Sequence, residues 1–270
     1  MLRQPAVAGA FYPGDKARLT AMLEGLLVSD LTVEGVVGAV SPHAGYMFSG
    51  AAAGALLASF AIPPAVVILG PNHWGLGESY GILDTGALRT PLGDVAIDEK
   101  LAASVKAHVA FVKSDTLSHA REHSIEVQVP FLQQCRRDVK IVPISIREHN
   151  FSRLCELGRG IAAAVRESGG DVLVLASSDM THQESAESAH RKDRLAVERM
   201  LALDEEGLWT TVSRHDISMC GVAPAVSTIV AARELGAVEG KLVRYMTSGD
   251  VTGDNDEVVG YASLVFVREN

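Results

Sequence analysis

The sequence predicts an α/β protein, with a mostly parallel central sheet covered by helices on both faces. Apolar, β-branched runs recur along the chain, and helix-like stretches lie between them. Because parallel strands need long crossover connections that are usually helices, this alternation favours a parallel sheet buried on both sides. No linker, composition break or internal repeat divides the 270 residues. We therefore expect a single domain over residues 1–270.

The expected elements follow in order along the chain. Strands are expected at residues 36–40, 66–69, 141–146, 172–176 and 258–267, and helices at residues 48–60, 99–108, 124–135, 151–168, 184–203 and 224–235. Pro224 near the first turn and Gly236 after the last turn mark the ends of the final helix. Residues 80–97 contain two short runs around Gly86 and a Pro-Leu-Gly turn, which predicts a hairpin. The last strand follows a Gly- and Asp-rich loop, so we expect it to pair antiparallel at an edge.

The composition restricts the classes of partner. The chain has 24 Lys and Arg against 33 Asp and Glu, a net charge of −9, and no basic run. Nucleic acids and anionic membranes require clustered positive charge, so a small-molecule substrate is the expected partner. The uncharged stretch 51–70 is interrupted by Pro63 and Pro64 and is expected to form a helix and a strand rather than a membrane span. The start of the chain lacks a secretory signal, which favours the cytoplasm.

Three histidines follow three of the expected strands in the same manner. His43, His73 and His182 each lie in a short polar turn after an apolar run. In open α/β sheets ligands bind beyond the carboxyl ends of the strands, so these side chains are expected near one another. Imidazole is a frequent ligand of transition metals, which makes the three residues candidates for a metal site. Alternatively, each histidine only caps or hydrogen-bonds its turn.

Cys220 and Asp179 are two further candidates. Cys220 lies in a Gly-containing loop just before the last expected helix, whose amino end would favour a thiolate. It is therefore a candidate third ligand, or else a small buried residue, as we expect for Cys135 and Cys155. Asp179 precedes His182 by three residues and could fix the tautomer of an acid/base histidine. It could equally cap the following helix.

Residues 121–126 open an expected amphipathic helix. His123 and Glu126 would share one helical face and could form an acid/base pair, a metal pair, or a couple that orients a ligand. Glu122 and Glu126 could instead be first-turn acids that complement the helix dipole, which the residues alone favour. The remaining histidines lie in polar or helical-surface contexts and are expected to be solvated: His108, His119, His149, His190 and His215.

Several ordered motifs together resemble the Memo family, the protein B of the AmmeMemoRadiSam system. They are residues 3–13 (RQPAVAGAFYP), 42–46 (PHAGY), 70–73 (GPNH), 122–126 (EHSIE), 177–182 (SSDMTH), 220–221 (CG) and the closing 260–263 (GYAS). The resemblance covers essentially the whole chain. A phosphate-binding Gly-rich loop, a G-x-S-x-G elbow and an H-E-x-x-H pair are absent from the sequence, so NTPase, serine-hydrolase and zincin functions lack their motifs.

The resemblance implies the fold of class III extradiol dioxygenases, which open catechol rings at a non-haem Fe(II). It places a metal site on His43, His73 and Cys220, with Asp179 and His182 close by and His182 as the acid/base residue. His123 and Glu126 belong to the family pattern. The dioxygenases use two histidines and a glutamate, whereas this chain offers a thiolate, which favours Cu(I) or Zn(II) as well as iron. The family also implies a link to radical-SAM and AMMECR-type proteins.

Three functional hypotheses follow. The first is a cytoplasmic, dioxygenase-like oxidoreductase that uses Fe(II) to act on a small organic substrate with O₂. The second is a non-catalytic module on the same fold that binds a peptide or a metal ion. The third is a zinc-dependent hydrolase, in which bound water is the nucleophile.

Overall fold

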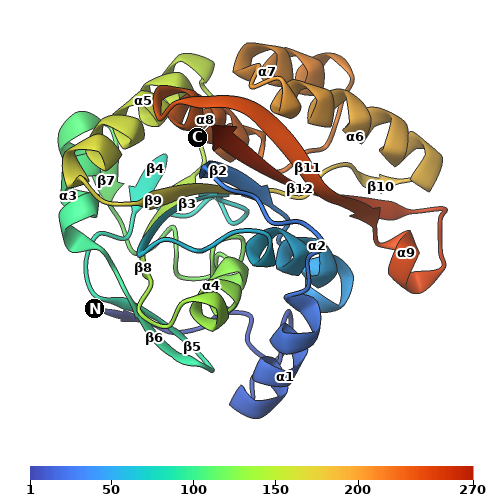
Figure 1. Ribbon diagram of the computed structural model, residues 1–270, viewed down its shortest axis with the longest axis horizontal. Coiled ribbons are helices and arrows are strands. Elements are labelled where there is room, and N and C mark those ends of the chain that lie inside the picture. Colours follow the sequence, from blue (N-terminus) through green and yellow to red (C-terminus); the bar gives the residue numbers. More distant parts are fainter. Residues whose placement is uncertain (270) are drawn as a thin grey trace.

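The computed structural model describes residues 1–269, and its centre is a nine-stranded sheet (Figure 1). The strand order is β10-β12-β2-β9-β3-β8-β4-β7, and β11 pairs with β12. The strands are β2 (Val36–Ser41), β3 (Ala65–Pro71), β4 (Tyr80–Ile82), β7 (Lys113–Ser114), β8 (Lys140–Ile146), β9 (Val172–Ser177), β10 (His182–Glu184), β11 (Ala237–Thr247) and β12 (Val258–Arg268). The middle strands β2, β9, β3 and β8 are all parallel, whereas β12 and β4 run antiparallel to their neighbours β2 and β8. The predicted α/β class with a largely parallel centre is therefore confirmed.

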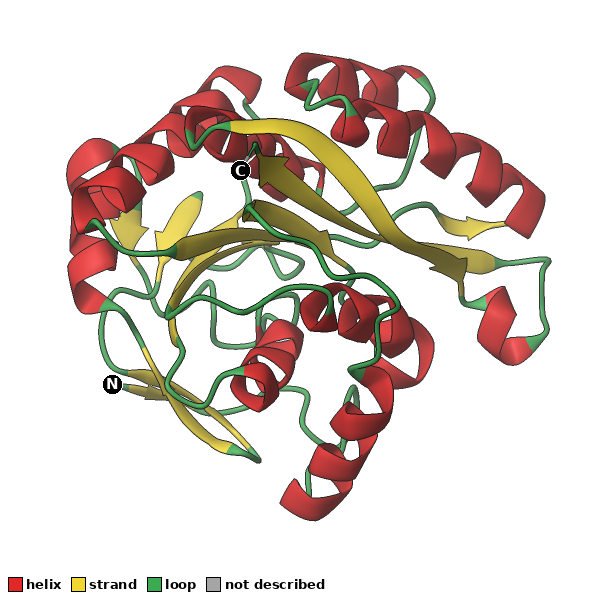
Figure 2. Ribbon diagram, viewed as in Figure 1, coloured by secondary structure: helices red, strands yellow, loops and turns green. Residues whose placement is uncertain are grey.

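Helices cover both faces of the sheet (Figure 2). One layer contains α3 (Glu99–His108), α5 (Phe151–Ser168), α6 (Ala186–Leu201), α7 (Glu205–Arg214) and α8 (Val222–Glu234). The other contains α1 (Lys16–Leu26), α2 (Tyr46–Ala58) and α4 (Val129–Cys135), and a short α9 (Gly249–Thr252) lies near the β11–β12 turn. Local sequence sets the ends of α5, because the Asn150 side chain caps its first turn and Gly169 adopts a φ of 63° after its last.

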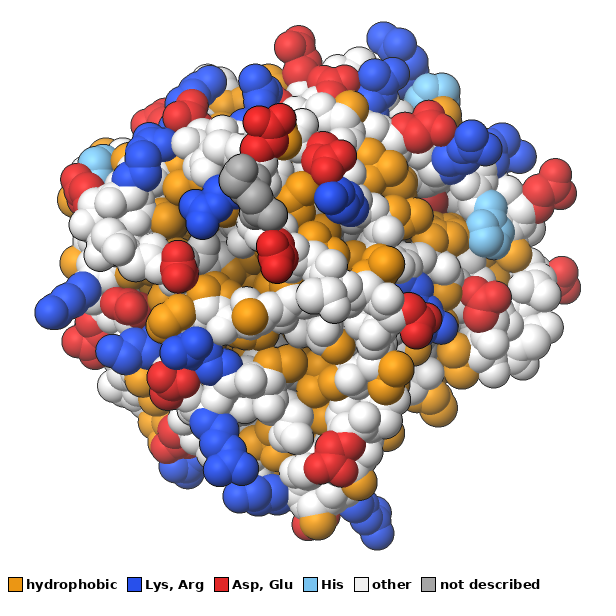
Figure 3. Space-filling view, in the orientation of Figure 1, with side chains coloured by type: hydrophobic (Ala, Val, Ile, Leu, Met, Phe, Trp, Pro, Cys, Tyr) orange, Lys and Arg blue, Asp and Glu red, His pale blue; other side chains and the backbone are white. Residues whose placement is uncertain are grey.

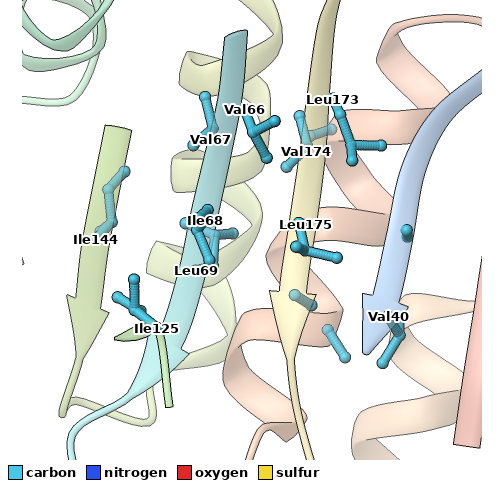
Figure 4. Close-up of a cluster of buried hydrophobic side chains, with 14 of the residues drawn as sticks. Val40, Val66, Val67, Ile68, Leu69, Ile125, Ile144, Leu173, Val174 and Leu175 are labelled. Carbon is cyan, nitrogen blue, oxygen red and sulfur yellow. The ribbon is translucent and has the colours of Figure 1, made fainter. Parts of the chain in front are cut away.

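The hydrophobic core lies between the middle strands and the helices that cover them. Figure 4 shows buried side chains of this core along the middle strands. Val40, Val66, Ile68, Leu173 and Leu175 are all fully buried. Continuous β-branched and leucine runs are expected in strands with both faces covered, since neither face alternates with solvent. Each such side chain contributes roughly 1.5–3 kcal/mol of burial free energy, so this core holds the strand ends that carry the polar loops in place.

The last strand differs from the prediction in one respect. Its pairing is antiparallel, as expected, and β2 is one neighbour, but it does not form the edge, because β11 pairs along its other side. Much of β11 is exposed, so its sequence has no apolar run to predict it. The expected helix at residues 124–135 also starts later, with the 3₁₀ turn η1 (Glu126–Gln128) preceding α4. Ser124 instead bonds the Pro71 carbonyl through its hydroxyl, which holds residues 121–125 in a loop.

The expected hairpin forms as β5 (Ala87–Thr90) and β6 (Gly93–Ala96), and β1 (Leu2–Arg3) joins β5 to make a separate three-stranded sheet. The uncharged stretch 51–70 lies in α2 and β3, as predicted. Within residues 1–269, every helix is too short or too polar to cross a membrane. On the face shown in Figure 3, Lys and Arg side chains are interspersed with Asp and Glu.

Candidate metal centre

Three histidines meet beyond the carboxyl ends of β2 and β3. His43 follows β2, His73 follows β3, and His123 lies in the loop before η1. Each offers one ring nitrogen, and these three nitrogens all lie within 4.8 Å of one another. The His73 and His123 rings stack with centroids 4.6 Å apart, and His43 is edge-on to His73 at 5.2 Å. The group could therefore hold a metal ion.

The surroundings of His43 fix its tautomer. Its Nδ1 lies 2.9 Å from the Ser177 hydroxyl, which donates its own hydrogen to the Ser124 carbonyl at 2.6 Å. Ser177 Oγ also accepts a hydrogen bond from Gln128 Nε2. Since the hydroxyl has only one hydrogen, Nδ1 of His43 must be the donor, and Nε2 retains its lone pair. Burial, followed by the nearby His73 and His123, lowers the pKa of His43 well below its usual value, which keeps the ring neutral.

His73 is held by Glu122. Its Nδ1 lies 2.8 Å from one carboxylate oxygen, and its backbone N–H donates to the other at 2.7 Å. A carboxylate only accepts, so Nδ1 carries a hydrogen, and in the neutral ring Nε2 then keeps its lone pair, the arrangement typical of histidines that bind metals. Burial raises the pKa of Glu122, but the His73 hydrogen bond and charge and the Ser124 N–H outweigh it and lower the pKa to about 2. Glu122 thus orients a candidate ligand, and no helix begins at this residue.

Cys220 lies beside this group rather than within it. Its Sγ is 3.2 Å from His43 Nε2, but it is not one of the three residues whose ligand atoms come together. Burial and the Asp179 carboxylate raise the pKa of the thiol far above its usual value, although Cys220 directly precedes the N-cap of α8. The metal-free residue is therefore a thiol. Its role as a ligand stays a prediction. Of the other cysteines, Cys155 is buried as expected, whereas Cys135 is exposed at the end of α4.

Asp179 and His182 have different partners from those expected. The Asp179 carboxylate accepts from the His43 backbone N–H at 2.7 Å, and burial raises its pKa to about 6. His182 Nδ1 instead lies 3.0 Å from the Ser218 carbonyl, and its backbone N–H donates to the Ser218 hydroxyl. Because a carbonyl only accepts, Nδ1 of His182 carries a hydrogen, and Nε2 is the ring nitrogen that this bond does not hold. His182 also contributes to the low pKa of His43, so its ring lies within electrostatic reach of the cluster.

Glu126 does not act together with His123 but anchors the N-terminal segment. It is fully buried and pairs with the Arg3 guanidinium. It also accepts hydrogen bonds from the backbone N–H groups of residues 6 and 7 and from the Tyr12 hydroxyl. Glu126 and His123 do not share a helical face, because residues 123–125 precede η1. The N-terminal segment that Glu126 anchors brings the Phe11 ring to 4.7 Å from the His123 ring.

One histidine expected to be solvated is buried. His119 is 4% exposed, and its Nε2 lies 3.0 Å from the Gly81 carbonyl. Ser177 and Ser218, which orient His43 and His182, were not singled out by sequence. Ser177 lies in the SSDMTH motif, whose predicted functional residues were Asp179 and His182. Ser218 orients the His182 ring through its backbone carbonyl, which any residue type would supply, so the sequence gives no signal for it.

Comparisons with known proteins identify the family of the chain and a solved structure with the same fold. The model of the Memo-like protein family matches residues 3–265. A MEMO1 family protein of Methanopyrus kandleri is 44% identical, with 99% of this chain and 100% of that protein covered. One of Pyrobaculum aerophilum is 43% identical, with 99% of each covered. The solved structure of an uncharacterized protein of Escherichia coli K12 shares the fold, with a TM-score of 0.57 at 12% identity, covering 85% of this chain and 99% of that one. This chain therefore belongs to the Memo family.

Proposed function

We propose that this protein is a metal-dependent, dioxygenase-like oxidoreductase that acts on a small organic substrate at the three-histidine cluster, with Fe(II) as its metal. The observation that carries the proposal is the hydrogen bonding of the His43 and His73 rings. His43 and His73 both have Nδ1–H committed to an acceptor, and in a neutral ring this leaves the lone pair of Nε2 available to a metal. Ring nitrogens in this state are suited to binding a metal.

The donor set fits a divalent transition metal. His43, His73 and His123 would hold it, and three protein ligands leave positions for substrate and O₂. Imidazole suits iron, copper and zinc alike, whereas inclusion of the Cys220 sulfur would favour Cu(I) or Zn(II). When bound, Fe(II) would supply the redox step and polarise a substrate oxygen.

The protein residues around the cluster would control proton transfer and orientation. His182 would give or take a proton at Nε2, because the Ser218 carbonyl holds its Nδ1–H. Asp179 holds the backbone of His43 in place, and Glu122 does the same for both the backbone and the ring of His73. These fixed positions reduce the reorganisation needed when substrate binds.

Metal content tests the proposal most directly. The protein is purified without oxygen, reconstituted with Fe(II) and analysed for bound iron beside His43→Ala, His123→Ala, Cys220→Ser and the control His190→Ala. We expect iron to be lost in the first two variants and retained in the control. Equal iron content in wild type and His43→Ala would refute the assignment. A loss in Cys220→Ser with retention in His123→Ala would make the sulfur the third ligand.

Turnover separates the chemistry from simple metal binding. With a panel of phenolic and catecholic compounds, we expect the iron-loaded protein to consume O₂ and the His182→Gln variant to consume it at least about tenfold more slowly, because general acid/base groups typically contribute about 10²–10⁴-fold. Iron binding must be unchanged in that variant. Hydrolytic activity with zinc and no O₂ uptake with iron would instead support the zinc-hydrolase hypothesis.

A further inference from the structure

An arginine and a tryptophan lie beside the three-histidine cluster. Trp74 directly follows His73 and is 48% exposed, and Arg121 precedes His123 by two residues and is also exposed. The guanidinium carbon of Arg121 lies 3.8 Å from the centroid of the Trp74 ring. This distance is within the range of cation–π stacking. The two loops that supply His73 and His123 are therefore joined a second time by this contact.

Within the described part of the chain, the stacked guanidinium has no acidic partner. Among residues 1–269, Arg121 forms no salt bridge with an Asp or Glu side chain, and its ring contact is with Trp74. The adjacent Glu122 is buried and committed to His73 and to the Ser124 N–H. Stacking covers a face of the guanidinium but leaves its N–H edge available, and that edge matches a carboxylate with two parallel hydrogen bonds.

The chain geometry places the backbone of both residues close to the cluster. Adjacent Cα atoms are about 3.8 Å apart, and two residues span at most about 7 Å. The Cα atoms of Trp74 and Arg121 therefore lie within about 7 Å of the Cα atoms of the neighbouring candidate ligands, a distance that a small molecule can bridge. The Phe11 ring, 4.7 Å from His123, gives the cluster an aromatic neighbour. A molecule with a carboxylate at one end and a flat apolar body could reach all three features.

We propose that Arg121, held in place by Trp74, binds the carboxylate of the substrate, and that the substrates are small aromatic carboxylates. This inference rests on the proposed function, since it names the substrate class of the same site. The net charge of −9 repels organic anions from the protein as a whole, so a dedicated cation beside the cluster is needed to select them.

Benzoate and benzamide test this inference, because they have nearly the same shape and differ in charge. Trp209→Phe leaves Trp74 as the reporter, since the sequence has two tryptophans. Quenching of its fluorescence is titrated with each compound at constant ionic strength, in metal-free and Zn(II)-loaded protein. In this background, Arg121→Gln removes the charge, and Arg121→Lys keeps the charge without the planar edge. Arg147→Gln is the matched control, because Arg147 bonds the Gly75 carbonyl of the same loop.

We expect benzoate to bind at millimolar concentrations and about tenfold more tightly than benzamide. Arg121→Gln should abolish this preference and Arg121→Lys should reduce it, while Arg147→Gln preserves it. Equal binding of the two compounds, or an equal loss in Arg147→Gln, would overturn the inference. The readout needs no iron and no turnover, so it can fail while the metal proposal stands, and a failure of iron binding leaves it unaffected.

Discussion

Replacement of Glu126 by glutamine tests whether this residue anchors the N-terminal segment. The Glu126 carboxylate is buried against the Arg3 guanidinium, whose side chain is 4% exposed. Glutamine keeps the size and one acceptor oxygen but removes the charge, which leaves Arg3 buried without a counterion. Removing one partner of a buried ion pair costs about 3–5 kcal/mol. For a chain of this size, each kcal/mol lowers Tm by about 2 °C, so we expect a decrease of roughly 6–10 °C.

Equilibrium urea unfolding of the metal-free protein, followed by circular dichroism, gives the free energy of unfolding without a contribution from metal binding. Arg3→Met and the double variant complete a thermodynamic cycle. Because the two side chains are in contact, we expect a coupling energy of at least about 2 kcal/mol. Additive costs, or a loss below about 1 kcal/mol for Glu126→Gln alone, would show that the contact does not stabilise the fold.

Three other predictions concern histidine protonation, backbone packing and metal affinity. Burial lowers the pKa of His119 from 6.5 to about 4, so the unfolded chain takes up the proton first, and stability should fall by about 3 kcal/mol as the pH decreases from 6.5 to 4. In urea titrations, His119→Gln should lose most of this dependence, and an unchanged slope would contradict the account. A Cβ at Gly54 would lie 2.1 Å from the Leu26 carbonyl oxygen, so Gly54→Ala should cost about 1–3 kcal/mol in thermal unfolding, whereas Gly25→Ala, with open space around it, should cost nothing. Ser177→Ala removes the acceptor of His43 Nδ1–H and should weaken Zn(II) binding by about 10- to 100-fold in chelator competition, and wild-type affinity would count against the assigned tautomer.

Sequence patterns predicted the parts of the fold that depend on burial. The middle strands could be predicted because both of their faces are covered, which makes their runs continuously apolar. In contrast, β11 is largely exposed and has no such run, so it was missed and the position of β12 in the sheet was wrong. The loop at residues 121–125 was predicted as helix, because its spacing is helical and the Ser124 bond to Pro71 cannot be inferred from local sequence.

At the candidate site, too, some residues could be predicted from local sequence and others could not. His43 and His73 could be identified because each directly follows an apolar strand, and strand ends meet at one edge of a parallel sheet. Their partners could not be assigned, because these are supplied by distant segments. Glu122 lies 49 residues from His73, and Ser177 lies 134 residues from His43. Asp179 was assigned to the nearby His182, but its carboxylate holds the more distant His43.

Strand register is the physical link between the sheet and the chemistry of His43. Ser41, two residues before His43, is paired with Ser177 in the parallel register of β2 and β9. Since side chains alternate between the faces of a strand, a shift of one residue would turn the Ser177 hydroxyl to the opposite face. The Nδ1–H of His43 would then lose its acceptor, and the tautomer with a free Nε2 would no longer be favoured. The apolar residues that fix the register of β9 therefore also determine whether this histidine can act as a metal ligand.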